Sequence, residues 1–231
     1  SEISGHPDSK WGGSVMAALQ IKNIPTGAGD DLKIDVSYAK GNTKNVISTS
    51  GGSPSFAMFG GTDRIGAYQS IGFGQTSDAV FLPGFLTGGA TGDIKLTEAW
   101  GVRGAFNHNW DPFWSTSLWG SYAGVRYNGD AFDILSAKGQ FCASFNFGKT
   151  RSADYSCNPD FNIAQVGMVT RWTPVKNLTF SGEVGAFFLD QKFTGAVGPG
   201  GAAVAAPKPV AVYEFKDQST VYLNVRVQRN F

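Results

Sequence analysis

The chain has 231 residues and a formal net charge of +1, and charged residues make up 16% of it, against roughly 25% in ordinary soluble domains. The near balance of basic and acidic residues excludes a general electrostatic attraction to nucleic acid or anionic lipid. A mean hydropathy of −0.13, with no run of about 18 apolar residues, excludes a helical membrane protein. Few charges, 31 glycines and 13% aromatic residues favour an all-β fold, an antiparallel transmembrane β-barrel in which every second residue of a strand meets lipid.

The first half of the chain contains two predicted hairpins. Residues 10–22 and 32–40 alternate apolar and polar side chains around a turn rich in Pro, Gly and Asp, and this pattern predicts two half-buried strands. Residues 55–60 and 64–74 predict a second pair of strands around the sequence GGTD.

The second half contains five predicted strands, which cover residues 96–110, 113–127, 162–172, 177–190 and 219–231. The last strand is the clearest, because its even-numbered and odd-numbered residues differ in kind. Valines and a leucine occupy one face, whereas Tyr222, Asn224 and Arg226 occupy the other. Residues 210–216 are expected to extend this strand beyond the membrane as a hairpin arm.

The connections between the predicted strands alternate in length. Short turns are expected at residues 25–31, 60–63, 111–112 and 173–176, and long loops at residues 41–54, 75–93, 128–160 and 194–209. Outer-membrane barrels have short periplasmic turns and long extracellular loops. Trp11, Trp110, Trp114 and Trp172 are expected at the short-turn ends of the strands, where they would form an interfacial aromatic girdle. A soluble β-sandwich would explain the strands but neither of these two asymmetries.

Several segments resemble the porins of alphaproteobacterial outer membranes, typified by the major porins of Brucella and the rhizobia. These segments are DDLKIDVSYAKG, AWGVRGAFNHNW, CNPDFNIAQVG followed by WTPVKNL, and the final YLNVRVQRNF. The resemblance implies a 16-stranded, trimeric porin of the bacterial outer membrane that allows passive diffusion of small hydrophilic solutes. It also implies that the terminal Phe231 is the aromatic signal read by the outer-membrane assembly machinery.

About nine strands can be identified in residues 1–231, which we interpret as a single transmembrane β-barrel domain. Bacterial single-chain barrels have an even number of strands, so we expect the chain to be the C-terminal portion of a longer porin. The remaining part would hold about seven strands and the inward-folded loop that narrows such pores. The alternative is one further strand, hidden in residues 80–92 or 132–147, and a smaller closed barrel.

In a porin, function depends on ionisable residues that face the channel. Strand parity nominates six pore-lining residues, namely Lys33, Asp35, Arg103, Arg171, Glu183 and Arg226. A charge on the lipid face near the bilayer midplane would cost about 2–4 kcal/mol, which favours the inward placement. Opposed arginines and carboxylates would filter solutes by charge. Alternatively, these residues form ordinary salt bridges along the wall. Lys22 and Arg64 are expected at the periplasmic rim.

Cys142 and Cys157 are the only cysteines, and the pair is compatible with a disulfide in an oxidising compartment. Two free thiols are the alternative. With only His6 and His108 as histidines, no catalytic triad, metal cluster or cofactor site is predicted. Outer-membrane lipids and small hydrophilic solutes are the expected partners. A second functional hypothesis is a surface-exposed barrel with adhesive or structural loops.

Overall fold

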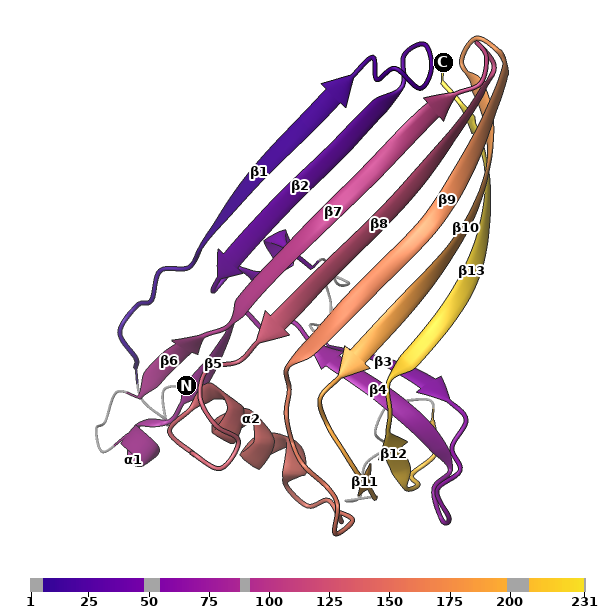
Figure 1. Ribbon diagram of the computed structural model, residues 1–231. Coiled ribbons are helices and arrows are strands. Elements are labelled where there is room, and N and C mark those ends of the chain that lie inside the picture. The colour runs from indigo at the N-terminus through magenta and orange to yellow at the C-terminus, as the bar shows by residue number, and fades with distance from the viewer. Residues whose placement is uncertain (1–5, 48–54, 88–91, 199–207, 231) are drawn as a thin grey trace.

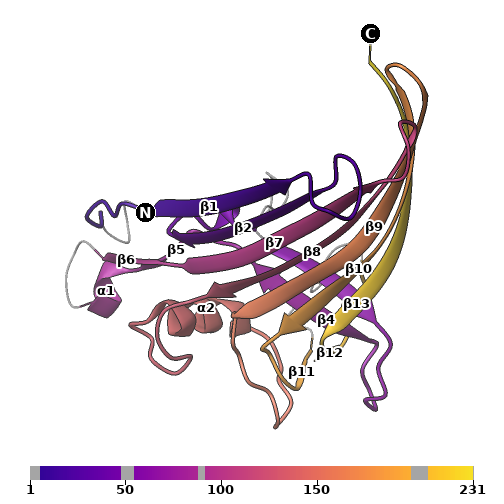
Figure 2. The same cartoon turned by 45° about the horizontal axis from the view of Figure 1, so that its top comes forward.

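A computed structural model describes residues 6–47, 55–87, 92–198 and 208–230. Seven long strands form one antiparallel, curved sheet, which we call the wall (Figures 1 and 2). In spatial order these strands are β1 (Gly13–Lys22), β2 (Asp31–Lys40), β7 (Glu98–Asn109), β8 (Trp114–Arg126), β9 (Phe161–Val175), β10 (Leu178–Gln191) and β13 (Gln218–Arg229). Each has 10 to 15 residues, and about 9–11 residues suffice for a tilted strand to cross a bilayer.

The outer face of the wall is a continuous apolar band. Residues paired across neighbouring strands point to the same side, and apolar residues are paired with one another from β1 to β13. Val36 is paired with Ala17 and Val102, for example, and Val184 is paired with Met168 and Leu223. Val221, Leu223 and Val225 are each more than 70% exposed. Such a band suits contact with lipid.

The inner face of the wall has two halves. Toward the long loops it is apolar and covered: Ala99, Val125 and Phe161 are fully buried there and belong to one hydrophobic cluster with Ile47, which follows the short helix η1 (Thr43–Asn45). Toward the short turns it is polar and open. The segment between β2 and β7 therefore covers the inner face at the loop end.

The remaining elements lie together at the loop end of the wall, and we call them the cap (Figure 1). The cap contains a four-stranded sheet, a two-stranded sheet and two α-helices. In chain order its elements are β3 (Ser55–Gly60), β4 (Gln69–Gln75), β5 (Ala79–Leu82), α1 (Gly84–Thr87), β6 (Asp93–Leu96), α2 (Ala137–Asn146), β11 (Ala196–Val197) and β12 (Tyr213–Phe215). None of the helices in the described residues is long and apolar enough to span a membrane.

Contacts between distant segments hold the cap together. Phe145 of α2 contacts the rings of Phe73 in β4 and Phe193 after β10, so three loops share one aromatic core. Arg64 forms a two-point ion pair with Asp154. This hydrogen bonding to Arg64 holds the pKa of the Asp154 carboxyl well below its usual range.

The prediction that strands at residues 55–60 and 64–74 pair as a hairpin is confirmed in part: β3 and β4 pair antiparallel, but β4 begins only at Gln69, so residues 64–68 belong to the turn. Their place in the predicted barrel was wrong: both strands belong to the cap. With six and seven residues they are shorter than a membrane-spanning strand, and β4 is largely buried on both faces. The turn at residues 60–63 is therefore at the loop end. Arg64, which follows it, lies in the cap and not at the periplasmic rim.

Two other expectations about the loops were wrong. Residues 210–216 do not extend the last strand: β12 pairs in parallel with β4 in the cap. Residues 132–147 hide no strand, because they include helix α2, which begins after the capping hydroxyl of Ser136. The described residues of the range 80–92 contribute to β5 and α1 and to no strand of the wall.

Candidate functional site: the polar inner face of the wall

All six nominated charged residues belong to strands of the wall and share the parity of its inner face. Asp35 is paired with Arg103 across β2 and β7. On the other side of the wall, Ser181 of β10 is paired with both Arg171 and Arg226. Five of the six residues line three open recesses on this face. The sixth, Asp35, is bonded through its carboxylate to Arg103. The structure therefore brings these residues together on one polar surface.

Two ion pairs neutralise much of the charge near β2. The guanidinium Nε of Arg103 donates to Asp35 Oδ1 at 2.9 Å. Lys33 Nζ lies 3.0 Å from Asp31 Oδ2, and this carboxylate oxygen also accepts a hydrogen bond from Gln20 at 2.8 Å. Asp31 was not predicted as an inner-face residue. It is the last residue of the turn predicted at residues 25–31, and strand alternation does not give the direction of a side chain in a turn.

Arg171 is held by uncharged partners. Its guanidinium donates to the Ser117 hydroxyl at 2.8 Å, and that hydroxyl donates to Asn107 Oδ1 at 2.8 Å. Asn107 in turn donates to Asn109 Oδ1 at 3.2 Å. This network joins β9, β8 and β7 and orients Arg171 without neutralising its charge.

Two aromatic side chains on the inner face lie against glycines of the next strand. A Cβ atom at Gly167 would be 2.5 Å from Cζ2 of Trp119, and one at Gly185 would be 2.6 Å from the Tyr222 hydroxyl. Both glycines are therefore needed for these close approaches. Each ring therefore lies over its glycine, and Trp119 also lines two of the open recesses beside Arg171.

The short turn between β1 and β2 is organised by a buried carboxylate. Asp30 is fully buried and accepts hydrogen bonds from the Thr26 hydroxyl at 2.6 Å and from the Asn109 backbone N–H at 2.9 Å. His108 Nδ1 lies 2.7 Å from the same carboxylate, and its ring packs edge-on against Trp110. The hydrogen bond from Thr26, more than the others, lowers the pKa of Asp30 to about 2. The sequence placed His108 near a short turn but missed Asp30 as its partner.

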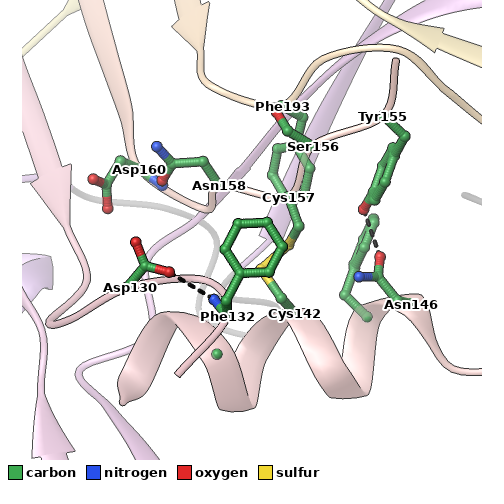
Figure 3. The surroundings of a disulfide bond; sticks show 12 residues. Asp130, Phe132, Cys142, Asn146, Tyr155, Ser156, Cys157, Asn158, Asp160 and Phe193 are labelled. Atoms are coloured by element: carbon green, nitrogen blue, oxygen red, sulfur yellow. Dashed lines mark hydrogen bonds between the residues drawn. A yellow bond between two sulfur atoms is a disulfide. The ribbon is translucent and has the colours of Figure 1, made fainter. Parts of the chain in front are cut away.

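The predicted pairing of the cysteines is confirmed. Cys142 on α2 is bonded to Cys157, which precedes β9 (Figure 3). Nearby, the Tyr155 hydroxyl donates to Asn146 Oδ1 at 2.5 Å, and burial raises the pKa of this tyrosine to about 12. The disulfide thus fastens the cap helix to the chain segment that enters the wall.

Three further expectations concern the turn end of the wall. The placement of Trp11 there was wrong, because it precedes β1, whose first residue is paired with Lys40 at the loop end. Lys22 ends β1 beside a short turn, as expected of a residue at that rim. Phe231, the expected assembly signal, lies outside the described residues. No cluster of His, Cys, Asp or Glu suited to a metal ion occurs in the part of the chain that the structure describes.

The amphipathic curved wall, its polar inner face and its loop-end cap suit a membrane channel, and a comparison with known families tests this. The model of the porin subfamily matches residues 1–224 of the chain. Neither the curated proteins nor the solved structures gave a significant match. The family match covers nearly the whole chain, and it shows that the protein belongs to the porin family, whose members are outer-membrane channels and not enzymes.

Proposed function

We propose that the protein forms a water-filled channel for the passive diffusion of small hydrophilic solutes and ions across the bacterial outer membrane. The single observation that carries this proposal is the contrast between the two faces of the wall. One face is an apolar band across seven strands, and the other carries five of the six nominated charged residues in open recesses. A lipid-facing exterior and a polar lumen are the two surfaces of a diffusion channel.

The segment that follows β2 supports selection by size. Val46 and Ile47 line one recess together with Arg103 of the wall, so the segment after β2 narrows the space beside an ion-paired residue. A solute would enter between the cap elements and then pass the polar half of the inner face. Electrostatic selection by Lys33, Asp35, Arg103, Arg171, Glu183 and Arg226 would follow there.

The channel requires a closed barrel. β1 and β13 occupy the two edges of the wall and run in the same direction, because all six pairings between the seven strands are antiparallel. An antiparallel barrel that includes this wall therefore needs an odd number of further strands between β13 and β1. We propose that these strands belong to the same porin, of which residues 1–231 form the C-terminal part, and that three such barrels assemble in the membrane. A native subunit well above 24.5 kDa is the expected result, and an active pore of subunits of that mass would contradict it.

A surface role for the cap is the second candidate function. Phe132 and Phe147 are 96% and 87% exposed, and both line a recess of about 520 Å³ beside the disulfide and Arg151. Exposed aromatic side chains near a cation are common at protein interaction sites. An adhesive function predicts that Phe132→Ser abolishes attachment to a surface or ligand and leaves solute diffusion unchanged.

Liposome swelling tests the diffusion proposal. Proteoliposomes containing the purified protein should swell in uncharged sugars, at rates that fall steeply with sugar size. Empty liposomes and liposomes with heat-denatured protein serve as controls. Swelling no faster than in these controls would refute the proposal and leave the surface role as the better explanation.

A further inference from the structure

We propose that Arg171 and Arg226 form a subsite for small dicarboxylates on the inner face of the wall, near its turn end. The inference rests on the proposed channel function and adds to it a class of solute. The two arginines line a recess that contains no cap residue.

The sheet register places the two arginines on either side of one small residue. Ser181 of β10 is paired with Arg171 of β9 and with Arg226 of β13. Neighbouring strands are about 4.8 Å apart, so the two arginine backbones are separated by roughly 10 Å. Both side chains line the same recess, of about 480 Å³. The small Ser181 side chain between them leaves room for a ligand.

Neither guanidinium is neutralised by a carboxylate within salt-bridge distance in the described part of the chain. Arg171 donates to the Ser117 hydroxyl, which leaves most of its five N–H donors for a ligand. Glu183 lines the same recess, but it is paired with Val169 and Asn224, one row away from the arginines. The three charges of the recess thus give a net charge of +1.

The chemistry of the recess fits two linked carboxylates. An arginine binds a carboxylate with two parallel hydrogen bonds, and two arginines on opposite sides of Ser181 offer two such positions. Asn224 and Gln228 line the recess as well and supply amide groups for a polar ligand. A monocarboxylate would engage only one guanidinium, and a dication would be repelled by both. A short dicarboxylate is the simplest ion that pairs both arginines at once.

The test uses the native protein in planar bilayers, with succinate as the dicarboxylate probe and acetate as the monocarboxylate. In chloride solution, succinate should reduce the channel current at concentrations where acetate has little effect. Arg171→Gln and Arg226→Gln should each raise the half-blocking concentration of succinate roughly tenfold, as expected for the loss of one charged hydrogen-bonding partner. Lys176→Gln is the matched control, because it removes one positive charge from the exposed turn of the same hairpin outside the recess.

The outcomes separate the subsite from the channel proposal. Normal chloride conductance with equal block by succinate and acetate would overturn the subsite alone, as would equal effects of Lys176→Gln and the two arginine variants. A protein without conductance would refute the channel. In that case titration calorimetry with succinate in detergent still decides the subsite, which predicts measurable heat for the wild-type protein and none for the double variant of Arg171 and Arg226.

Discussion

Asp35 and Arg103 face each other directly across β2 and β7, with the carboxylate Oδ1 2.9 Å from the guanidinium Nε. The Arg103 side chain is 56% exposed, so water screens the pair and its contribution to stability is about 1 kcal/mol or less. Its main effect is on charge, because it cancels one cation and one anion on the inner face.

Replacement of Asp35 by Asn should therefore change selectivity more than stability. The variant frees the positive charge of Arg103, and we expect the reversal potential in a KCl gradient to shift toward anion preference. Asp8→Asn is the control, because Asp8 is exposed and precedes the wall. An equal shift in both variants, or none in either, would contradict a role for this pair in ion selection.

Position 166 tests which face of the wall meets lipid. Val166 is 55% exposed on the apolar band, whereas its neighbour Gln165 belongs to the polar inner face. Val166→Lys should reduce the free energy of unfolding in lipid by about 2–4 kcal/mol. Gln165→Lys should change it far less. Unfolding titrations in liposomes measure both variants, and equal losses would mean that the two faces are wrongly assigned.

The disulfide should protect the cap from proteolysis. The bond closes a loop of 15 residues, which corresponds to roughly 3 kcal/mol in the chain-entropy model. In the double variant Cys142→Ala, Cys157→Ala, trypsin should cleave after Lys149 or Arg151 much faster than in the oxidised protein. The strands of the wall should resist in both proteins. Cleavage at the same rate would show that the aromatic core holds the cap without the disulfide.

The Asp30 turn should respond to acid. The folded-state pKa of Asp30 is about 2, below the usual value near 3.9 for an unfolded chain. The carboxylate therefore stabilises the fold fully above about pH 4, and this stabilisation is lost as the pH falls toward 2. Thr26→Val removes the largest cause of the lowered pKa.

Thermal unfolding of the purified protein between pH 2 and 7 measures this effect. In Thr26→Val the folded-state pKa of Asp30 should lie closer to its unfolded value, so the stability lost between pH 4 and pH 2 should be smaller than in the wild-type protein. Thr62→Val is a useful control, because Thr62 bonds to Glu214 in the cap, far from this turn. Identical pH profiles for the wild-type protein and Thr26→Val would contradict the account of the turn.

The sequence revealed the seven strands of the wall because each has an exposed apolar face and a polar face. This alternation is a local property, and the 12 residues of β13 show it without any tertiary information. The same parity gave the inner-face residues. The structure places all six on strands of the wall, and their place in a pore stays a prediction.

Features that depend on distant contacts could not be read in the same way. Two short strands, β3 and β4, also alternate. They belong to the cap because β4 pairs in parallel with β12, more than 140 residues later, and this pairing cannot be predicted from local sequence. Asp30 looked like an ordinary turn residue, and its importance comes from His108 and Asn109 on another hairpin. Helix α2 has the sequence AKGQFCASFN, in which the apolar residues do not recur with a clear helical period, so no helix was predicted there.

The most direct measurement of the central claim is single-channel recording of the purified native protein in planar lipid bilayers. A passive channel should give discrete conductance steps in KCl that persist without an added energy source. Asp35→Asn and Arg171→Gln should alter the ion preference of these steps in opposite directions. A correctly folded, membrane-inserted protein that gives no conductance steps would contradict the central claim.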